Sequence, residues 1–291
     1  MANLITRMQD YYAWTLTLVD PRSKGWLLVD SPWPTFWGIV VYLSIVFFGP
    51  KLMRNRKPLR LNRILVVYNL AMAILNFYIF WQLLTASISL NYSIFCEPCR
   101  QVYTVDEMKI VSAVWWYYIS KLFEFSDTIF FILRKKDNQL SFLHIYHHST
   151  MFAFWWIGIK WVPSGSTAMP AIVNSFIHVL MYSYYGLSAI GPHMNKYLWW
   201  KKYLTIIQLI QFAGALILGF NGLRIDCDFP LWMQYTLCGY MVSFLVLFGR
   251  FYTKAYIDDH KKRREHKKLL ANNNEEMEQN NNAISNGKKH K

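Results

Sequence analysis

The feature that most constrains the fold is a series of long apolar segments, each able to cross a lipid bilayer. A helix needs about 20 mostly apolar residues to span the hydrocarbon core. Seven segments approach or meet this length: 35–53, 64–85, 111–133, 140–159, 168–190, 203–221 and 231–252. The sequence therefore predicts an all-α membrane protein with seven transmembrane helices.

Composition and the placement of aromatic residues agree with insertion in lipid. Charged residues make up only 16% of the 291 residues, whereas they make up about a quarter of a typical soluble domain. Tryptophans gather near the ends of the predicted spans, as expected for interfacial anchors: Trp33, Trp37, Trp115, Trp116, Trp199 and Trp200. The first 32 residues lack the pattern of a cleavable signal peptide, so internal spans are expected to direct insertion.

The charge of the loops predicts the orientation of the chain. Six basic residues and no acidic residue lie from Lys51 to Arg63, and the loops after the third and fifth predicted spans are also basic. By the positive-inside rule, the C-terminus then lies in the cytosol and the N-terminus on the opposite side. We therefore predict a lumenal segment over 1–32, a seven-span catalytic domain over 33–252 and a basic, disordered cytosolic tail over 253–291.

Several short motifs favour the endoplasmic reticulum. Lys288 and Lys289 resemble a dilysine retrieval signal at the C-terminus, although a solvated basic end is the alternative. Cys96 and Cys227 fall in loops on the oxidising lumenal side and are candidates for a disulfide, with Cys99 as a competitor. Asn91 begins an acceptor sequence for N-glycosylation on the same side.

Ionisable residues inside the predicted spans are costly to bury in lipid and mark function by default. The third span carries Lys121, Glu124 and Asp127 at steps of three, so these residues share one helical face and partly neutralise each other. They form either a structural ion pair between helices or a set that organises a catalytic site.

Three histidines, His144, His147 and His148, begin the fourth span and lie on one helical face. Their chemistry is either metal ligation or nucleophilic and acid–base catalysis. The fifth span adds a polar stripe in which the tyrosines could simply pack; its members are Asn174, His178, Tyr182 and Tyr185. Gln208 and Gln211 in the sixth span form another stripe, for which interhelical hydrogen bonds are the alternative.

The polar faces of the third, fourth and fifth spans predict one buried cavity with a basic mouth on the cytosolic side. Arg134, Lys135 and Lys136 lie at this mouth, and Lys201 and Lys202 follow in a later loop. A basic rim suits phosphate groups, and an apolar tunnel below it suits a long acyl chain. Together they indicate acyl-CoA as the ligand. Nucleic acid is a weaker interpretation, because the basic residues do not form a separate domain.

The polar motifs of the three spans resemble those of the ELO family of very-long-chain fatty acid elongases. KLFEFSDT resembles the family pattern K-x-x-E-x-x-D-T, HIYHH resembles H-x-x-H-H, and NSFIHVLMYSYYG resembles N-x-x-x-H-x-x-M-Y-x-Y-Y. The similarity covers about 20–255 and is closest to the animal branch that acts on long and very long chains. One departure is Thr205-Ile206-Ile207-Gln208, where members acting on polyunsaturated chains carry T-Q-x-Q; this argues against a strictly polyunsaturated substrate preference.

The resemblance implies the condensing step of fatty acid elongation, in which acyl-CoA and malonyl-CoA give 3-oxoacyl-CoA, carbon dioxide and CoA. It also implies six helices around an acyl-chain tunnel, and no metal or cofactor besides the two substrates. The implied partners are the reductases and dehydratase that complete the cycle, and association with itself or with other elongases is left open.

The mechanism that follows is nucleophilic catalysis by histidine, because none of the four cysteines accompanies the polar stripes. Imidazole attacks thioesters and gives a reactive acyl-imidazole. We predict His147 as the nucleophile, oriented by His144 and His148. His178 and Asn174 are expected to polarise a carbonyl or stabilise an enolate.

Two other classes are weaker alternatives. A di-iron desaturase or hydroxylase also uses H-x-x-H-H, but four of the eight histidines lie outside the spans, namely His193, His260, His266 and His290. A seven-span transporter often shows internal repeats and broken helices, which this sequence lacks. A receptor has no need of three histidines on one helical face.

Overall fold

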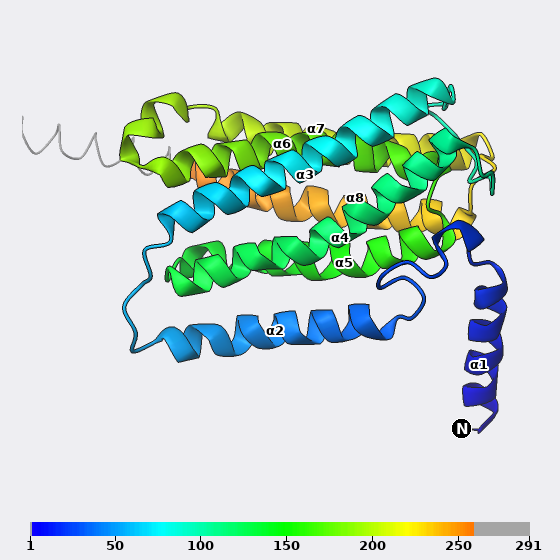
Figure 1. The fold of residues 1–291 in the computed structure, drawn as a ribbon, viewed down its shortest axis with the longest axis horizontal. Helices are drawn as coiled ribbons and strands as arrows, with labels where there is room; N and C mark the ends of the chain where they lie inside the picture. Colours follow the sequence, from blue (N-terminus) through cyan, green and yellow to red (C-terminus); the bar gives the residue numbers. More distant parts are fainter. Residues whose placement is uncertain (1, 259–291) are drawn as a thin grey trace, which may run out of the picture. The chain divides into compact units, whose positions relative to one another are not determined.

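The computed structural model describes residues 2–258, in which the regular secondary structure is helical and no strand is found. The α-helices, labelled in Figure 1, are α1 (Ala2–Thr17), α2 (Trp33–Met53), α3 (Asn62–Ser89), α4 (Val105–Leu133), α5 (Phe142–Trp161), α6 (Ala168–Ile190), α7 (Lys201–Arg224) and α8 (Leu231–Tyr252). Shorter helical turns are η1 (Pro21–Ser23), η2 (Asp137–Gln139), η3 (Gly165–Thr167), η4 (Pro192–Tyr197) and the π-helical η5 (Thr253–Asp258). The chain divides into two compact units after Val242, and the site described below lies in the first unit.

Each of the seven predicted spans coincides with one of the helices α2 to α8, so the all-helical fold is confirmed. Within the described residues, four helical segments are long and apolar enough to cross a membrane: Trp33–Met53, Asn62–Ser89, Lys201–Arg224 and Leu231–Asp258. Helices α4, α5 and α6 are long enough but carry the charged and polar residues of the three motifs, which lower their hydropathy. Helix α1 was not predicted from the sequence.

Local signals in the sequence account for where the central helices begin. The hydroxyl of Thr104 accepts a hydrogen bond from the Glu107 amide at the start of α4, and the hydroxyl of Ser141 accepts one from the His144 amide at the start of α5. Such caps satisfy backbone donors that have no partner within the helix. The cap at Ser141 thus places the first histidine in the opening turn of α5.

Helix α4 lies at the centre of the first unit and contacts α2, α3, α5 and α6. Helix α2 packs against α4 and α5, while α3 packs along α6, which also contacts α7. Figure 1 shows these helices running side by side, with the α2–α3 and α4–α5 connections at the same end. We call this the α4–α5 end, and the opposite end, which holds the α3–α4 and α5–α6 connections, the disulfide end.

A buried ionic network closes the disulfide end. The Arg22 guanidinium contacts Asp20 at 2.7 Å, Glu107 at 3.1 Å and the Ser164 hydroxyl at 2.9 Å. Arg22 is only 3% exposed, so its charge is compensated by partners rather than by water. This network ties the segment before α2 to the starts of α4 and of the α5–α6 connection.

Candidate active site

The three histidines of α5 form one surface, as their spacing predicts. The ring centroids of His144 and His148 are 4.3 Å apart, and those of His147 and His148 are 5.0 Å apart. His148 is buried, whereas His144 and His147 are partly accessible. The face therefore combines one enclosed imidazole with two that a ligand can reach.

Helix α4 places a buried ion pair beside this surface. The Lys121 ammonium lies 2.7 Å from Oε1 of Glu124, and both side chains are at most 1% exposed. The ammonium also lies 4.1 Å from the centroid of the Tyr117 ring, where the negative face of the ring attracts a cation. Sequence alone is consistent with a structural or a catalytic role for this pair, and the further contacts of Glu124 distinguish between them.

The Glu124 carboxylate joins histidines from two helices. Its Oε1 lies 3.2 Å from Nδ1 of His178 on α6, and its Oε2 lies 3.9 Å from Nδ1 of His148 on α5. Within residues 2–258, Glu124 Oε2 and both Nδ1 atoms lack an aligned hydrogen-bond partner. A buried polar atom in this condition is costly and needs an explanation, and a catalytic role is one such explanation.

Helix α6 completes the cluster. The ring centroids of His178 and His147 are 6.4 Å apart, so α5 and α6 bring these two imidazoles close together. One turn before His178, the Asn174 side-chain oxygen accepts a hydrogen bond from the Tyr117 hydroxyl. We use the name histidine cluster for His144, His147, His148 and His178.

Two further contacts fix the edges of the cluster. Asp127 Oδ2 accepts a hydrogen bond of 2.8 Å from the Tyr182 hydroxyl. Thr128 Oγ1 lies 2.7 Å from Nε2 of His144 and 3.2 Å from the Tyr42 hydroxyl of α2. A hydroxyl held from both sides in this way orients the imidazole that it contacts.

Sequence reasoning missed two of these residues. Tyr117 lies one helical turn before Lys121, so the spacing could have predicted its position on the same face of α4. The position of Tyr42 at the site could not be predicted, because a single tyrosine in the apolar α2 segment resembles any interfacial or packing residue. Only the packing of α2 against α4 brings it to Thr128.

Three of the predicted supporting residues lie further out. Tyr185 is 41% exposed, and its ring centroid is 6.5 Å from that of Tyr182. Gln208 and Gln211 lie on α7 and are partly buried, and Gln211 Oε1 has no hydrogen-bond partner among the described residues. A role for these three side chains in binding substrate stays a prediction.

The predicted basic rim lies at the α4–α5 end. Arg134, Lys135 and Lys136 follow directly on the last turn of α4, and the Lys135 ammonium donates a hydrogen bond of 2.9 Å to the Arg54 carbonyl. Because α5 begins only a few residues later, this rim and the first histidine belong to the same end of the helices.

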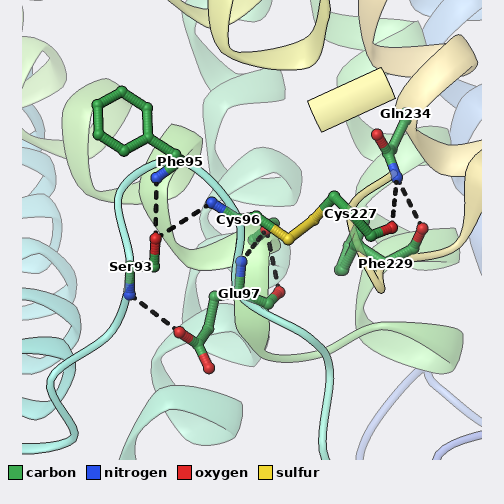
Figure 2. The surroundings of a disulfide bond; sticks show 8 residues. Ser93, Phe95, Cys96, Glu97, Cys227, Phe229 and Gln234 are labelled. Atoms are coloured by element: carbon green, nitrogen blue, oxygen red, sulfur yellow. Dashed lines mark hydrogen bonds between the residues drawn. A yellow bond between two sulfur atoms is a disulfide. The ribbon is translucent and has the colours of Figure 1, made fainter. Parts of the chain in front are cut away.

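At the disulfide end, Cys96 is bonded to Cys227, the pair that the loop positions suggested (Figure 2). The bond joins the α3–α4 connection to the α7–α8 connection across 131 positions of sequence. The Gln234 amide donates to the carbonyls of Cys227 and Phe229, which holds the second half of the bridge. Cys99 is a free thiol whose pKa is raised by burial.

The remaining predicted sites lie on the surface or outside the described residues. Asn91 is exposed, with a φ of 53° that asparagine tolerates better than most residues. Lys288 and Lys289 lie outside residues 2–258. Within those residues no group of three or more His, Cys, Asp or Glu side chains is arranged to hold a metal ion.

Comparison with known proteins identifies the family. The model of the GNS1/SUR4 family, ELO, matches residues 27–264, which include all three polar motifs. The chain belongs to the ELO family.

Curated relatives of the ELO chain agree with this assignment. It is 45% identical over 282 residues to very long chain fatty acid elongase 4 of Mus musculus, covering 97% of this chain and 90% of the relative. It is 48% identical over 252 residues to elongase 4 of Homo sapiens, covering 87% and 80%. It is 47% identical over 256 residues to elongase 5 of Homo sapiens, covering 88% and 85%. The resemblance predicted from the motifs is therefore confirmed at the level of the family.

Proposed function

We propose that this elongase condenses long-chain acyl-CoA with malonyl-CoA at the histidine cluster, with His147 as the nucleophile. The chain is a very-long-chain fatty acid elongase of the ELO family, which makes it a 3-oxoacyl-CoA synthase. The observation that carries the proposal is the meeting of imidazoles from α5 and α6 around one buried carboxylate of α4.

In the first half-reaction, the His147 imidazole attacks the thioester carbonyl and the carbon–sulfur bond breaks. CoA leaves as a thiol after taking up the proton that the imidazole loses, and the acyl group stays on the ring nitrogen. His147 suits this role because it is partly accessible and its ring centroid lies 6.4 Å from that of His178 on α6.

In the second half-reaction, malonyl-CoA loses carbon dioxide and its enolate carbon attacks the acyl-imidazole. A carbon–carbon bond forms, the imidazole leaves and regains a proton, and 3-oxoacyl-CoA is released. Donors aimed at the enolate oxygen lower the barrier to such a step. We assign this role to Asn174 and His178, which are one turn apart on α6.

The Lys121–Glu124 pair organises the cluster and also argues against a di-iron site. Glu124 lies close to His148 and His178, so it supplies the negative charge that stabilises a transiently protonated imidazole. A metal ion bound to the same carboxylate would face the Lys121 ammonium, which lies 2.7 Å from Oε1. Repulsion between the two cations disfavours ligation there.

We propose the following architecture around the site. Helices α2 to α8 are seven membrane spans, six of which surround the acyl-chain tunnel, over the domain 33–252. The N-terminal segment 1–32 lies in the lumen of the endoplasmic reticulum, and the tail 253–291 lies in the cytosol with the retrieval signal. Support comes from the four apolar segments and from the basic rim at the α4–α5 end. CoA phosphates are bound by Arg134, Lys135 and Lys136.

We further propose that the elongase works beside the reductases and dehydratase of the elongation cycle. The 3-oxoacyl-CoA product must be reduced and dehydrated before another round of condensation. Its long acyl chain partitions into the membrane, so enzymes held in the same membrane receive it without exchange through water.

Product analysis with a panel of acyl-CoA substrates and labelled malonyl-CoA tests the reaction. We expect purified wild-type protein to incorporate labelled carbon, and His147→Ala to lose at least a hundredfold in rate. His193→Ala is the matched control, because His193 is exposed in η4. Unchanged activity of His147→Ala would refute the assignment of the nucleophile. Stoichiometric iron in the active wild-type protein would instead support a metalloenzyme.

A further inference from the structure

A second charged surface lies at the α4–α5 end, on the connection between α2 and α3. We call this surface the basic connection; its residues are Arg54, Arg56, Lys57 and Arg60 of the connection and Arg63 in the first turn of α3, all of them exposed. Among residues 2–258, no carboxylate forms an ion pair with any of these five side chains. Their charge is therefore uncompensated by the described protein.

The basic connection is held in place by its backbone. The Leu59 amide donates a hydrogen bond of 2.9 Å to the Leu133 carbonyl at the end of α4. The Arg54 carbonyl accepts one of 2.9 Å from the Lys135 ammonium. The connection is thus attached to the turn that leads into α5, and its positive charge adds to that of the turn.

The flanking helices place these charges at a membrane surface. Both Trp33–Met53 and Asn62–Ser89 are apolar enough to cross a bilayer, and only eight residues, 54–61, join them. Exposed apolar side chains lie beside the charges, since Leu52 is 71% exposed and Ile64 is 54% exposed. A short connection between two spans stays within reach of the lipid headgroups.

We propose that the basic connection binds the headgroups of anionic phospholipids in the leaflet that it faces. Clusters of four to eight Lys and Arg residues next to a span are attracted to anionic lipid, and each residue near the surface strengthens binding by roughly fivefold. Free CoA phosphate is a less suitable occupant, because the charges lie beside exposed apolar residues of α2 and α3 such as Leu52 and Ile64. Bound lipid stabilises the turn before α5, because Leu133 and Lys135 of that turn are hydrogen-bonded to the basic connection.

The test compares lipid retention and turnover in nanodiscs of phosphatidylcholine, with and without one-fifth phosphatidylserine. The variant is R54Q/R56Q/K57Q. The matched control is R7Q/K24Q/R100Q, which removes three exposed charges outside the α4–α5 end. We expect wild type and control to retain phosphatidylserine in native mass spectrometry and to turn over faster when it is present. The variant should bind it at least tenfold more weakly and lose the rate increase.

Two further measurements separate the proposal from a loss of topology and from CoA binding. R54K/R56K/K57R keeps the charge and should behave as wild type, and retention by wild type should fall when salt is raised from 0.05 to 0.5 M. Equal phosphatidylserine retention by R54Q/R56Q/K57Q and wild type would overturn the proposal. The proposal would also be overturned if R54Q/R56Q/K57Q had a raised KM for acyl-CoA in every lipid mixture while its retention of phosphatidylserine was unchanged.

Discussion

At the scale of single residues, the charge around Glu124 determines how the site is built. Burying a carboxylate between packed helices is costly unless cations or donors compensate it. Lys121 compensates it directly, and the imidazoles of His148 and His178 lie close enough to respond to it. The pair is therefore both a structural contact and the electrostatic support of the histidines.

Removing one partner of this pair should destabilise the protein more than removing both. Lys121→Met leaves an uncompensated buried carboxylate, at a cost of about 3–5 kcal/mol, whereas Lys121→Met/Glu124→Gln leaves none. Thermal unfolding of the detergent-solubilised proteins should give a lower midpoint for the single variant than for the double variant. Equal midpoints would show that the ion pair has no structural role.

Tyr42 should affect the rate of condensation through Thr128 rather than through substrate binding. Tyr42→Phe removes one hydrogen bond to the hydroxyl that orients His144, which is worth about 1 kcal/mol. We expect kcat to fall about fivefold with little change in KM. Tyr78→Phe is the control, because Tyr78 is 42% exposed on α3. A changed KM with normal kcat would contradict a positioning role.

The residues that could be predicted are those whose spacing repeats along a single helix. Steps of three and four placed Glu124, His148 and His178 on polar faces before any contact was known. Tyr42 lies on a helix without such a stripe, and its role depends on packing between distant segments. Sequence periodicity reports which face of a helix is polar but not which neighbouring helix meets it.

At the scale of elements, the seven long helices followed from their apolar length, although three of them combine that length with polar motifs. The helix α1 and the short η turns did not follow, because their signals are local and short. The contact between the α3–α4 and α5–α6 connections could not be predicted from the sequence either. The Glu97 carbonyl accepts hydrogen bonds from the amide and the hydroxyl of Ser166, a contact between connections that lie far apart in sequence.

Gly165 in η3 should be required for this docking. Its φ is +67°, and a Cβ atom there would lie 2.7 Å from the carbonyl oxygens of Glu97 and Pro98. Gly165→Ala should therefore lower the unfolding midpoint, by strain of about 1–3 kcal/mol plus the displaced loop. Gly214→Ala is the matched control, because a Cβ on Gly214 meets no atom within 4 Å. An unchanged midpoint for Gly165→Ala would show that the loop adapts without cost.

At the scale of the whole molecule, the first histidine of α5 and the disulfide bond lie at different ends of the helices. The disulfide and the Arg22 network hold the connections at one end. The basic rim and the first turn of α5 lie at the other end, which we propose faces the cytosol.

Labelling of single cysteines in sealed microsomes tests this orientation. In a C99S/C238S background, Asn55→Cys in the α2–α3 connection should react with an impermeant maleimide. Lys24→Cys, near the disulfide end, should react only after the membrane is permeabilised. The reverse pattern would place the basic loops in the lumen and would contradict the proposed route of substrate entry.

The most direct measurement is to trap the acyl-enzyme intermediate and locate it by mass spectrometry. Wild-type protein is incubated with long-chain acyl-CoA in the absence of malonyl-CoA, digested under mild conditions and sequenced. We expect an acyl group on the peptide that contains His147, its loss in His147→Ala, and its removal when malonyl-CoA is added. An acyl group on Cys99 or Cys238, removed by malonyl-CoA in the same way, would contradict catalysis by histidine.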